Sequence, residues 1–251
     1  LENNKIYKNN FVPPWPDDLG VSIGAAYLEN HNLGKKSKND CQVYLGPGYS
    51  NADILSLLKK YNLTFIKPDN ISKYIAERIS KGRLIGWFQD RMEFTHRALG
   101  NRSILADPRK IEMQLKVNSA VKYRETFRPF APAVLEEHAS KIFMINKKTK
   151  VPFMEKAVSV KNDWKRKIPA VVHVDGTARV QTVSKKFNLS FYNLINEFYK
   201  ITNVPVLLNT SFNLNGEPIV MSPSDAIRTF HTCGLDTLVL QDYVIIKKTN
   251  K

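Results

Sequence analysis

Residues 205–218 read Pro-Val-Leu-Leu-Asn-Thr-Ser-Phe-Asn-Leu-Asn-Gly-Glu-Pro, an apolar run that passes directly into small polar side chains. The apolar part predicts a buried strand over 204–208, and Asn215-Gly216 predicts a turn. Hydroxyl and amide groups at the carboxyl end of a strand are well placed to hold a ligand. An Asx-turn that bonds only to its own backbone explains the same polar residues equally well.

The segments on either side of this stretch mix strand-like and helix-like patterns. Strands are predicted at 84–88, 131–135, 170–174, 179–183, 237–240 and 244–246. Helices are predicted at 20–31, 50–61, 69–80, 109–120, 136–143, 188–200 and 223–232. Because the strands do not alternate one for one with helices, we expect a mixed sheet in an α/β (α+β) domain.

Composition is that of a globular protein with an excess of positive charge. The chain has 251 residues, of which 43% are hydrophobic and 24% charged, and this balance excludes collagen-like, disordered and disulfide-dense classes. Its formal net charge of +15 favours anionic partners such as nucleotides, phosphorylated substrates or RNA. Pairs of adjacent lysines are equally typical of a solvated surface.

Three further features concern the cellular setting. Cys41 and Cys233 are too few for a disulfide framework or a zinc site, which favours a reducing, cytoplasmic setting. No apolar stretch approaches the roughly 20 residues of a membrane helix, so we expect no membrane span. The chain starts at Leu1 without a secretory leader, and we expect it to be part of a longer protein.

Arginines are concentrated in residues 89–109, directly after a predicted strand. Because they lie among apolar side chains, their planar guanidinium groups are suited to binding a carboxylate or phosphate. The four are Arg91, Arg97, Arg102 and Arg109. Internal ion pairs with the acidic residues of the same segment remain an alternative. Those acidic residues are Asp90, Glu93 and Asp107.

A second basic segment covers residues 121–132. If it is extended, Lys122 and Arg124 point to the same side and could meet one anion. Arg128, between Phe127 and Pro129, needs a specific counter-ion.

Other motifs carry less weight. The chain lacks the common glycine-rich phosphate loops, so side chains must supply the positive charge for any bound phosphate. His173 and Asp175 lie in a predicted hairpin, where a metal site is much less favoured than ordinary polar contacts.

Five blocks of the sequence together resemble the carboxyl-terminal half of the O-carbamoyltransferase family, whose members carbamoylate hydroxyl groups of nodulation factors and antibiotics. They occur in the family's order and cover most of residues 70–246. The blocks are Gly86-Trp-Phe-Gln89, Arg97-Ala-Leu-Gly-Asn-Arg-Ser-Ile-Leu-Ala-Asp-Pro-Arg109, Phe127-Arg-Pro-Phe-Ala-Pro132, Asp175-Gly-Thr-Ala-Arg179 and Asn209-Thr-Ser-Phe-Asn-Leu-Asn-Gly-Glu-Pro218.

The resemblance implies a fold and a set of nucleotide-binding residues. That half of the family is similar to the YrdC-type threonylcarbamoyl-adenylate synthases, whose K-x-R and S-x-N motifs match Lys122-Tyr-Arg124 and Ser211-Phe-Asn213. The implied fold is a YrdC-like twisted mixed sheet with flanking helices. Lys122, Arg124 and Arg179 are then the implied catalytic residues. The implied nucleotide-binding residues are Arg97, Arg102, Arg128, Ser211 and Asn213.

The resemblance also divides the chain in two. Residues 1–45 match the tail of the family's amino-terminal carbamoyl-transfer domain, of ASKHA type, and residues 46–251 match the YrdC-like domain. Asp18 matches a metal ligand of that amino-terminal domain, whose iron would be held only in a longer protein, because the histidine co-ligands are missing here.

The implied reaction is the ATP-dependent conversion of carbamoyl phosphate to carbamoyl-adenylate, with Mg²⁺, for transfer to a hydroxylated small-molecule acceptor. The implied partner is the amino-terminal domain, in the same chain or another, and whether the protein forms a homodimer is left open. The alternatives are a YrdC-type synthase acting in tRNA modification and a non-catalytic RNA-binding module, although the resemblance makes nucleic acid a poor candidate partner.

Overall fold

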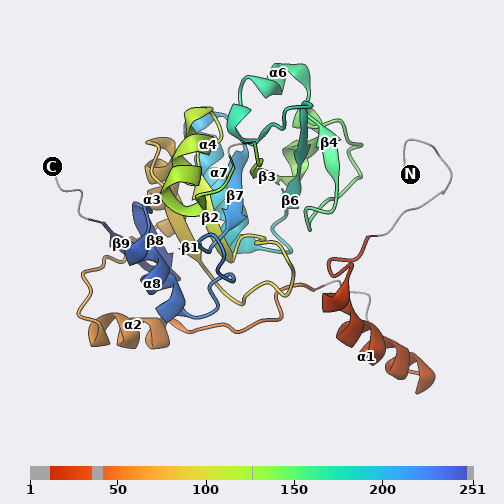
Figure 1. Ribbon diagram of the computed structural model, residues 1–251, viewed down its shortest axis with the longest axis horizontal. Coiled ribbons are helices and arrows are strands. Elements are labelled where there is room, and N and C mark those ends of the chain that lie inside the picture. Colours follow the sequence, from red (N-terminus) through yellow and green to blue (C-terminus); the bar gives the residue numbers. More distant parts are fainter. Residues whose placement is uncertain (1–11, 36–41, 126, 248–251) are drawn as a thin grey trace.

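The computed structural model describes residues 12–35, 42–125 and 127–247 (Figure 1). Its centre is a seven-stranded sheet in the order β6-β3-β7-β2-β1-β8-β9, and β4 and β5 form a separate two-stranded sheet. The strands are β1 Ile85–Phe88, β2 Arg102–Ala106, β3 Ala131–Leu135, β4 Ala157–Ser159, β5 Thr177–Arg179, β6 Gln181–Val183, β7 Val206–Ser211, β8 Thr237–Leu240 and β9 Tyr243–Ile246.

The central sheet is mixed, as the sequence predicts. Strand β1 runs parallel to β8, and β3 runs parallel to β6. The remaining neighbours are antiparallel. Strand β7 covers residues 206–211 of the stretch quoted first and lies between β3 and β2. Its polar end pairs with β2, and Asn209 also pairs with β3.

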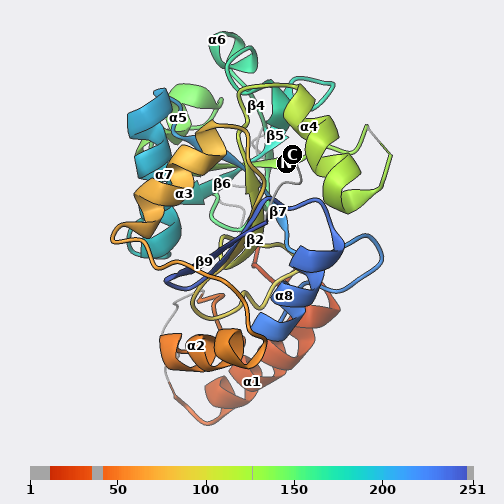
Figure 2. The same cartoon turned by 90° about the vertical axis from the view of Figure 1, so that its left-hand side faces the viewer.

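Helices cover both faces of the central sheet. Figure 2 shows α3 and α7 on one face, with α4 and α8 on the other. The helices are α1 Val21–Asn32, α2 Asn51–Lys60, α3 Ile71–Ser80, α4 Glu112–Val117, α5 Ala139–Ile142, α6 Asn162–Lys165, α7 Leu189–Thr202 and α8 Pro223–Thr232. Shorter turns are the 3-10 turns η1 Asp18–Gly20, η3 Glu136–His138 and η4 Pro169–Val171 and the π turn η2 Asn118–Lys122.

Local signals explain where several helices begin. Ser50 and Ser222 each form a capping box with the aspartate three residues later, and Asn70 and Asn188 accept bonds from the first turns of α3 and α7. The apolar faces of these helices pack on the strands in one core, which includes the buried Ile75, Phe198 and Phe230. Burial of that core is the main stabilising contribution to the fold.

One strand predicted from the sequence is wrong, and one condition considered there is not met. Residues 170–174 are not a strand, because Pro169 starts a 3-10 turn and the Ala170 N–H donates to the Pro108 carbonyl. The extended backbone that would point Lys122 and Arg124 to the same side is not present, because Lys122 ends the π turn and Tyr123 has a left-handed backbone. Strand β2, by contrast, is not predicted, although it lies buried in the middle of the sheet.

Some predictions fall partly on undescribed residues. The predicted linker at 33–40 and the predicted unit 1–45 both include positions outside the described ranges, as does Cys41. Cys233 is described as a buried free thiol. Within the described ranges, every helix is too short or too polar to cross a membrane.

Candidate active site

The buried Lys122 and the half-buried polar end of β7 form a hydrogen-bonded cluster. The Lys122 side chain leaves the π turn and reaches β7, where Nζ lies 2.7 Å from the Ser211 carbonyl oxygen and 3.1 Å from Ser211 Oγ. It also lies 2.7 Å from Asn213 Oδ1 and 3.1 Å from the Asn213 carbonyl oxygen. Ser211 Oγ in turn lies 2.6 Å from Asn213 Oδ1. The structure therefore brings together three predicted site residues from segments about 90 positions apart.

Arg124 and Arg179 each bring a half-buried guanidinium with unused hydrogen-bonding capacity. Arg124 stacks over the Phe130 ring at 4.8 Å from its centroid, and its Nη2 donates to the Pro129 carbonyl at 3.4 Å. Arg179 is the last residue of β5. The Nε atoms of both arginines are buried and have no hydrogen-bond partner among the described residues. A buried donor without a partner is costly unless a ligand completes it.

The positive groups lie close enough to perturb one another. Burial and the neighbouring Arg124 lower the pKa of the Lys122 amine to about 7. Burial, Arg97 and Arg124 lower the pKa of Arg179 to about 10. Arg124 has a lowered pKa from burial and from Arg128. These five residues, Arg97, Lys122, Arg124, Arg128 and Arg179, are called the cation cluster below.

The cation cluster has little negative charge to balance it. Among the described residues, no carboxylate lies within ion-pair distance of Lys122, Arg124 or Arg179. Arg128 has Glu125 at 3.8 Å, but both side chains are more than half exposed. The cation cluster therefore has uncompensated positive charge, and guanidinium groups are chemically suited to pair with an anion such as a phosphate.

Arg102 does not belong to the cation cluster. Its side chain is fully buried and stacks over the Phe88 ring at 3.5 Å from its centroid. Its two terminal nitrogens donate to four backbone carbonyls, those of Pro47, Gln89, Asp90 and Asn101. The prediction that Arg102 faces a phosphate is wrong, because this guanidinium is used to tie loops together.

A buried carboxylate organises the loop that carries Arg97. Glu93 Oε1 accepts backbone N–H bonds from Leu99, Asn101 and Arg102 at 2.6, 2.7 and 3.3 Å. The alternative of an arginine ion pair is therefore not realised for Glu93, although it is for Asp107, which pairs with Arg109 at 2.6 Å. Sequence reasoning missed this role, because the acceptor and donors meet only when the loop folds back.

The 173–179 segment forms an ordinary polar turn, which the sequence favours over a metal site. Asp175 accepts bonds from the Thr177 N–H and hydroxyl at 2.9 and 2.8 Å, and His173 Nδ1 lies 3.0 Å from that hydroxyl. Burial lowers the pKa of His173. The turn presents Arg179 to the cation cluster, and the described residues contain no group of three potential metal ligands.

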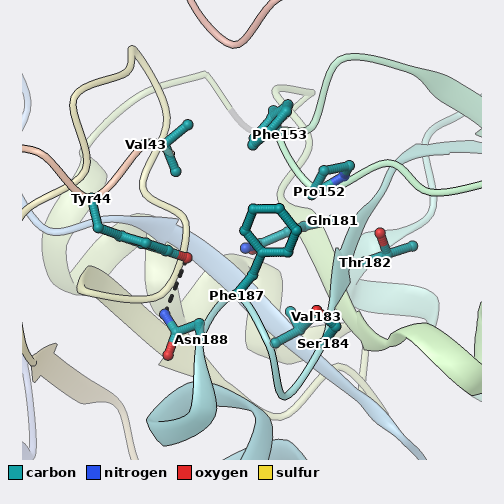
Figure 3. Close-up of a pocket in the computed structure, with 10 residues that line it drawn as sticks. All are labelled: Val43, Tyr44, Pro152, Phe153, Gln181, Thr182, Val183, Ser184, Phe187 and Asn188. Carbon is teal, nitrogen blue, oxygen red and sulfur yellow. Dashed lines mark hydrogen bonds between the residues drawn. The ribbon is translucent and has the colours of Figure 1, made fainter. Parts of the chain in front are cut away.

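A separate pocket lies beside edge strand β6 (Figure 3). Its polar groups bond to one another and to backbone: Asn188 Nδ2 donates to the Tyr44 hydroxyl at 3.2 Å, and that hydroxyl donates to the Leu99 carbonyl at 3.1 Å. Gln181 donates to the same carbonyl at 2.8 Å. No member of the cation cluster lines this pocket, so its polar groups support the loop at Leu99.

Comparison with known families identifies the chain. The family model described as the carbamoyltransferase C-terminus matches residues 76–247, which include the whole cation cluster. The chain belongs to this family. The sequence-based resemblance is thereby confirmed.

Named relatives of this carbamoyltransferase region are longer than the chain. It is 44% identical over 249 residues to nodulation protein NolO of Bradyrhizobium diazoefficiens, covering 97% of this chain and 45% of that protein. It is 44% identical to nodulation protein NolNO of Sinorhizobium fredii, covering 99% and 38%. Nodulation protein U of Rhizobium tropici is 35% identical, covering 86% and 36%. The chain thus spans less than half the length of these relatives.

One solved structure shares the fold of this carbamoyltransferase region. Full-length HypF, in its phosphate- and nucleotide-bound form, superimposes with a TM-score of 0.50 over 70% of this chain and 22% of that chain. The sequence identity is 14%, so the likeness concerns the fold alone.

The amino-terminal segment of this carbamoyltransferase region does not fit an iron ion by itself. Asp18 is exposed in the 3-10 turn η1, and the described residues offer no set of three His, Cys, Asp or Glu side chains around it. The adjacent Asp17 instead caps the turn and lies 2.7 Å from His96 Nε2, which holds its carboxyl pKa below the usual range.

Proposed function

We propose that this chain binds ATP at the cation cluster and uses it to convert carbamoyl phosphate to carbamoyl-adenylate. The observation that supports the proposal is that Lys122, Arg124 and Arg179 lie close together without a carboxylate partner among the described residues. Lys122 also contacts Ser211 and Asn213. Membership of the carbamoyltransferase family supports this reaction over the tRNA-modifying and RNA-binding alternatives.

The domain division expected from the resemblance accompanies this proposal. We assign residues 46–251 to a YrdC-like domain and residues 1–45 to the tail of an ASKHA-type transfer domain. The fold likeness to a nucleotide-bound structure is compatible with the first assignment. The second is supported by α1, in which no residue is buried.

The proposed chemistry needs positive charge more than it needs a nucleophilic side chain. Carbamoyl phosphate loses its phosphate to water and leaves carbamate. A carbamate oxygen then forms a bond to the α-phosphorus of ATP while the bond to the pyrophosphate oxygen breaks. Negative charge builds on the phosphate oxygens during this displacement, and Lys122, Arg124 and Arg179 are placed to stabilise it.

Ser211 and Asn213 fix the position of the Lys122 ammonium rather than react. Because Nζ has oxygen neighbours on β7 and on the loop after it, its proton donors are held at one point of the site. Mg²⁺ would enter with the phosphates of ATP, because the described part of the cluster offers no close carboxylate to Lys122, Arg124 or Arg179. The ion would supply further charge neutralisation.

The remaining partners are proposed for a longer protein. Carbamoyl-adenylate made here would pass to an amino-terminal domain, in the same chain or another, and that domain would transfer the carbamoyl group to a hydroxylated small molecule. Asp18 would contribute to the iron site only when that domain supplies the other ligands.

Pyrophosphate release tests the proposal. The purified chain is mixed with ATP, Mg²⁺ and carbamoyl phosphate, and released pyrophosphate is measured with a coupled assay. We expect release that depends on carbamoyl phosphate. Arg124→Ala and Arg179→Ala should each reduce it by about 100-fold, since each removes one charge donor from the transition state, worth roughly 3 kcal/mol.

Arg228→Ala is the matched control, because Arg228 is an exposed arginine on α8 that only approaches Asp225 at 3.9 Å. This variant should release pyrophosphate like the parent chain. Unchanged release in both Arg124→Ala and Arg179→Ala would refute the site assignment, whereas no release from the parent chain would refute the activity of the isolated chain.

A further inference from the structure

Tyr123 interrupts the basic segment with an unusual backbone. It has φ 44° and ψ 44°, in the left-handed region, where a bulky side chain is rarely found. The residue lies between Lys122 and Arg124, both in the cation cluster, and 63% of its own surface is exposed. A strained backbone next to a functional group calls for neighbouring contacts that hold it.

Asn118 supplies those contacts. The Tyr123 N–H donates to the Asn118 carbonyl at 2.7 Å. The Asn118 side chain bridges to the next residue, because its Oδ1 accepts from the Arg124 N–H at 3.3 Å and its Nδ2 donates to the Arg124 carbonyl. These hydrogen bonds form a ring around the left-handed turn. The ring runs from Asn118, at the start of the π turn, to Arg124, the residue after Tyr123.

This ring determines where the two neighbouring cations point. Lys122 lies inside the turn and is buried against β7, with 4% of its surface exposed. Arg124 leaves the turn toward Phe130. An extended backbone at Tyr123 would send the segment after Lys122 in another direction, so Arg124 could not remain beside both Lys122 and Arg179.

We propose that Asn118 is a positioning residue of the nucleotide site, which keeps Lys122 and Arg124 at the separation that one anion requires by holding Tyr123 in its left-handed conformation. The inference rests on the proposed function, in that the anion is a phosphate of ATP. Asn118 does not itself contact the phosphate. π turns are rare and occur often at functional sites, which fits this placement.

A double-mutant cycle tests the proposal through ATP affinity. The 251-residue chain is titrated with ATP by calorimetry, at a temperature where every variant is folded. Asn118→Ala removes both side-chain bonds to Arg124 and should weaken ATP binding roughly tenfold. Tyr123→Gly alone should change affinity by less than about twofold, because glycine adopts a positive φ readily.

The double variant separates positioning from general stability. Combining Tyr123→Gly with Asn118→Ala should restore most of the lost affinity, because the turn no longer needs the clamp. Ser222→Ala is the control, since it removes the N-cap of α8 and should lower the melting temperature without changing ATP affinity. Parent-like affinity in Asn118→Ala, or a double variant no better than Asn118→Ala, would overturn the proposal.

A second readout remains informative without ATP. The Lys122 amine is titrated by NMR in the same variants. Its pKa should rise in Asn118→Ala, as the turn opens and water reaches the amine, and should return in the double variant. No ATP binding by the parent chain would defeat the proposed function, whereas an unchanged Lys122 pKa in Asn118→Ala would defeat the role of Asn118.

Discussion

Lys122 places an amine that is normally charged in a buried position without a carboxylate partner among the described residues. Four oxygen atoms surround its amine, yet none belongs to a carboxylate, and Arg124 and Arg128 add repulsion. Its pKa falls from 10.5 to about 7 for these reasons, burial first. A bound phosphate would reverse the balance by pairing with the ammonium.

This conflict predicts how stability depends on pH. Between about pH 7 and 10.5 the unfolded chain keeps a proton on Lys122 that the folded chain has released, so the free energy of unfolding should rise with pH across that window. Denaturant unfolding at pH 7, 8, 9 and 10 measures the slope. Lys122→Met should flatten it, and equal slopes in the two proteins would contradict the lowered pKa.

The sequence predicts which residue types form the candidate site better than it predicts where each side chain lies. Lys122, Ser211 and Asn213 are identified by their resemblance to known motifs, and the structure places them in contact. Arg102 looks equivalent to Arg97 in sequence but is buried under four carbonyls, because its strand lies in the middle of the sheet. The resemblance identifies the residues that match the family's motifs. Only tertiary contacts show whether an arginine lies in the cation cluster or joins loops.

At the scale of elements, capped and strongly periodic segments are the predictable ones. Helix α8 occupies residues 223–232 as predicted, because Ser222 and Asp225 define its start. Residues 170–174 have the β-branched composition of a strand but lack a sheet neighbour, and Pro169 directs them into a turn. Strand β2 escapes prediction because its first residues, Arg102 and Ser103, are polar in a fully buried element.

The loop between β1 and β2 provides an element-scale prediction. Gly100 has φ 106°, and a Cβ there would lie 2.2 Å from Phe191 Cδ1 on α7. Gly100→Ala should therefore reduce the free energy of unfolding by about 2–5 kcal/mol, through backbone strain and overpacking. Urea unfolding measures the loss.

Gly24→Ala is the matched control for this substitution. A Cβ at Gly24 meets no atom within 4 Å, and alanine favours the interior of α1. This variant should be as stable as the parent chain or slightly more so. Equal stability of Gly100→Ala and the parent chain would show that the loop is not packed against α7 as described.

At the scale of the whole molecule, α1 stands apart from the sheet and its helices (Figure 1). It has no buried residue, and Val21 and Leu28 are 67% and 62% exposed. An apolar helix that packs so little within the described chain supports the proposed assignment of residues 1–45 to a unit separate from residues 46–251. The relatives that the chain matches are more than twice as long as the chain.

This arrangement predicts that polar substitutions on α1 are tolerated. Val21→Ser with Leu28→Ser should leave the melting temperature within about 2 °C, because little apolar surface is buried there. Ile75→Ser in α3 is the contrasting variant, since Ile75 is fully buried and should lower the melting temperature strongly. A large loss from the α1 variant would mean that α1 is part of the same folding unit.

In the proposed function, Lys122, Arg124, Arg179, Ser211 and Asn213 form one nucleotide site. A crystal structure of the chain with a non-hydrolysable ATP analogue would show whether they do. We expect phosphate oxygens within hydrogen-bond distance of the Lys122 amine and of the Arg124 and Arg179 guanidinium groups, including their buried Nε atoms. A nucleotide bound elsewhere, with these side chains in contact only with solvent and one another, would refute this nucleotide site.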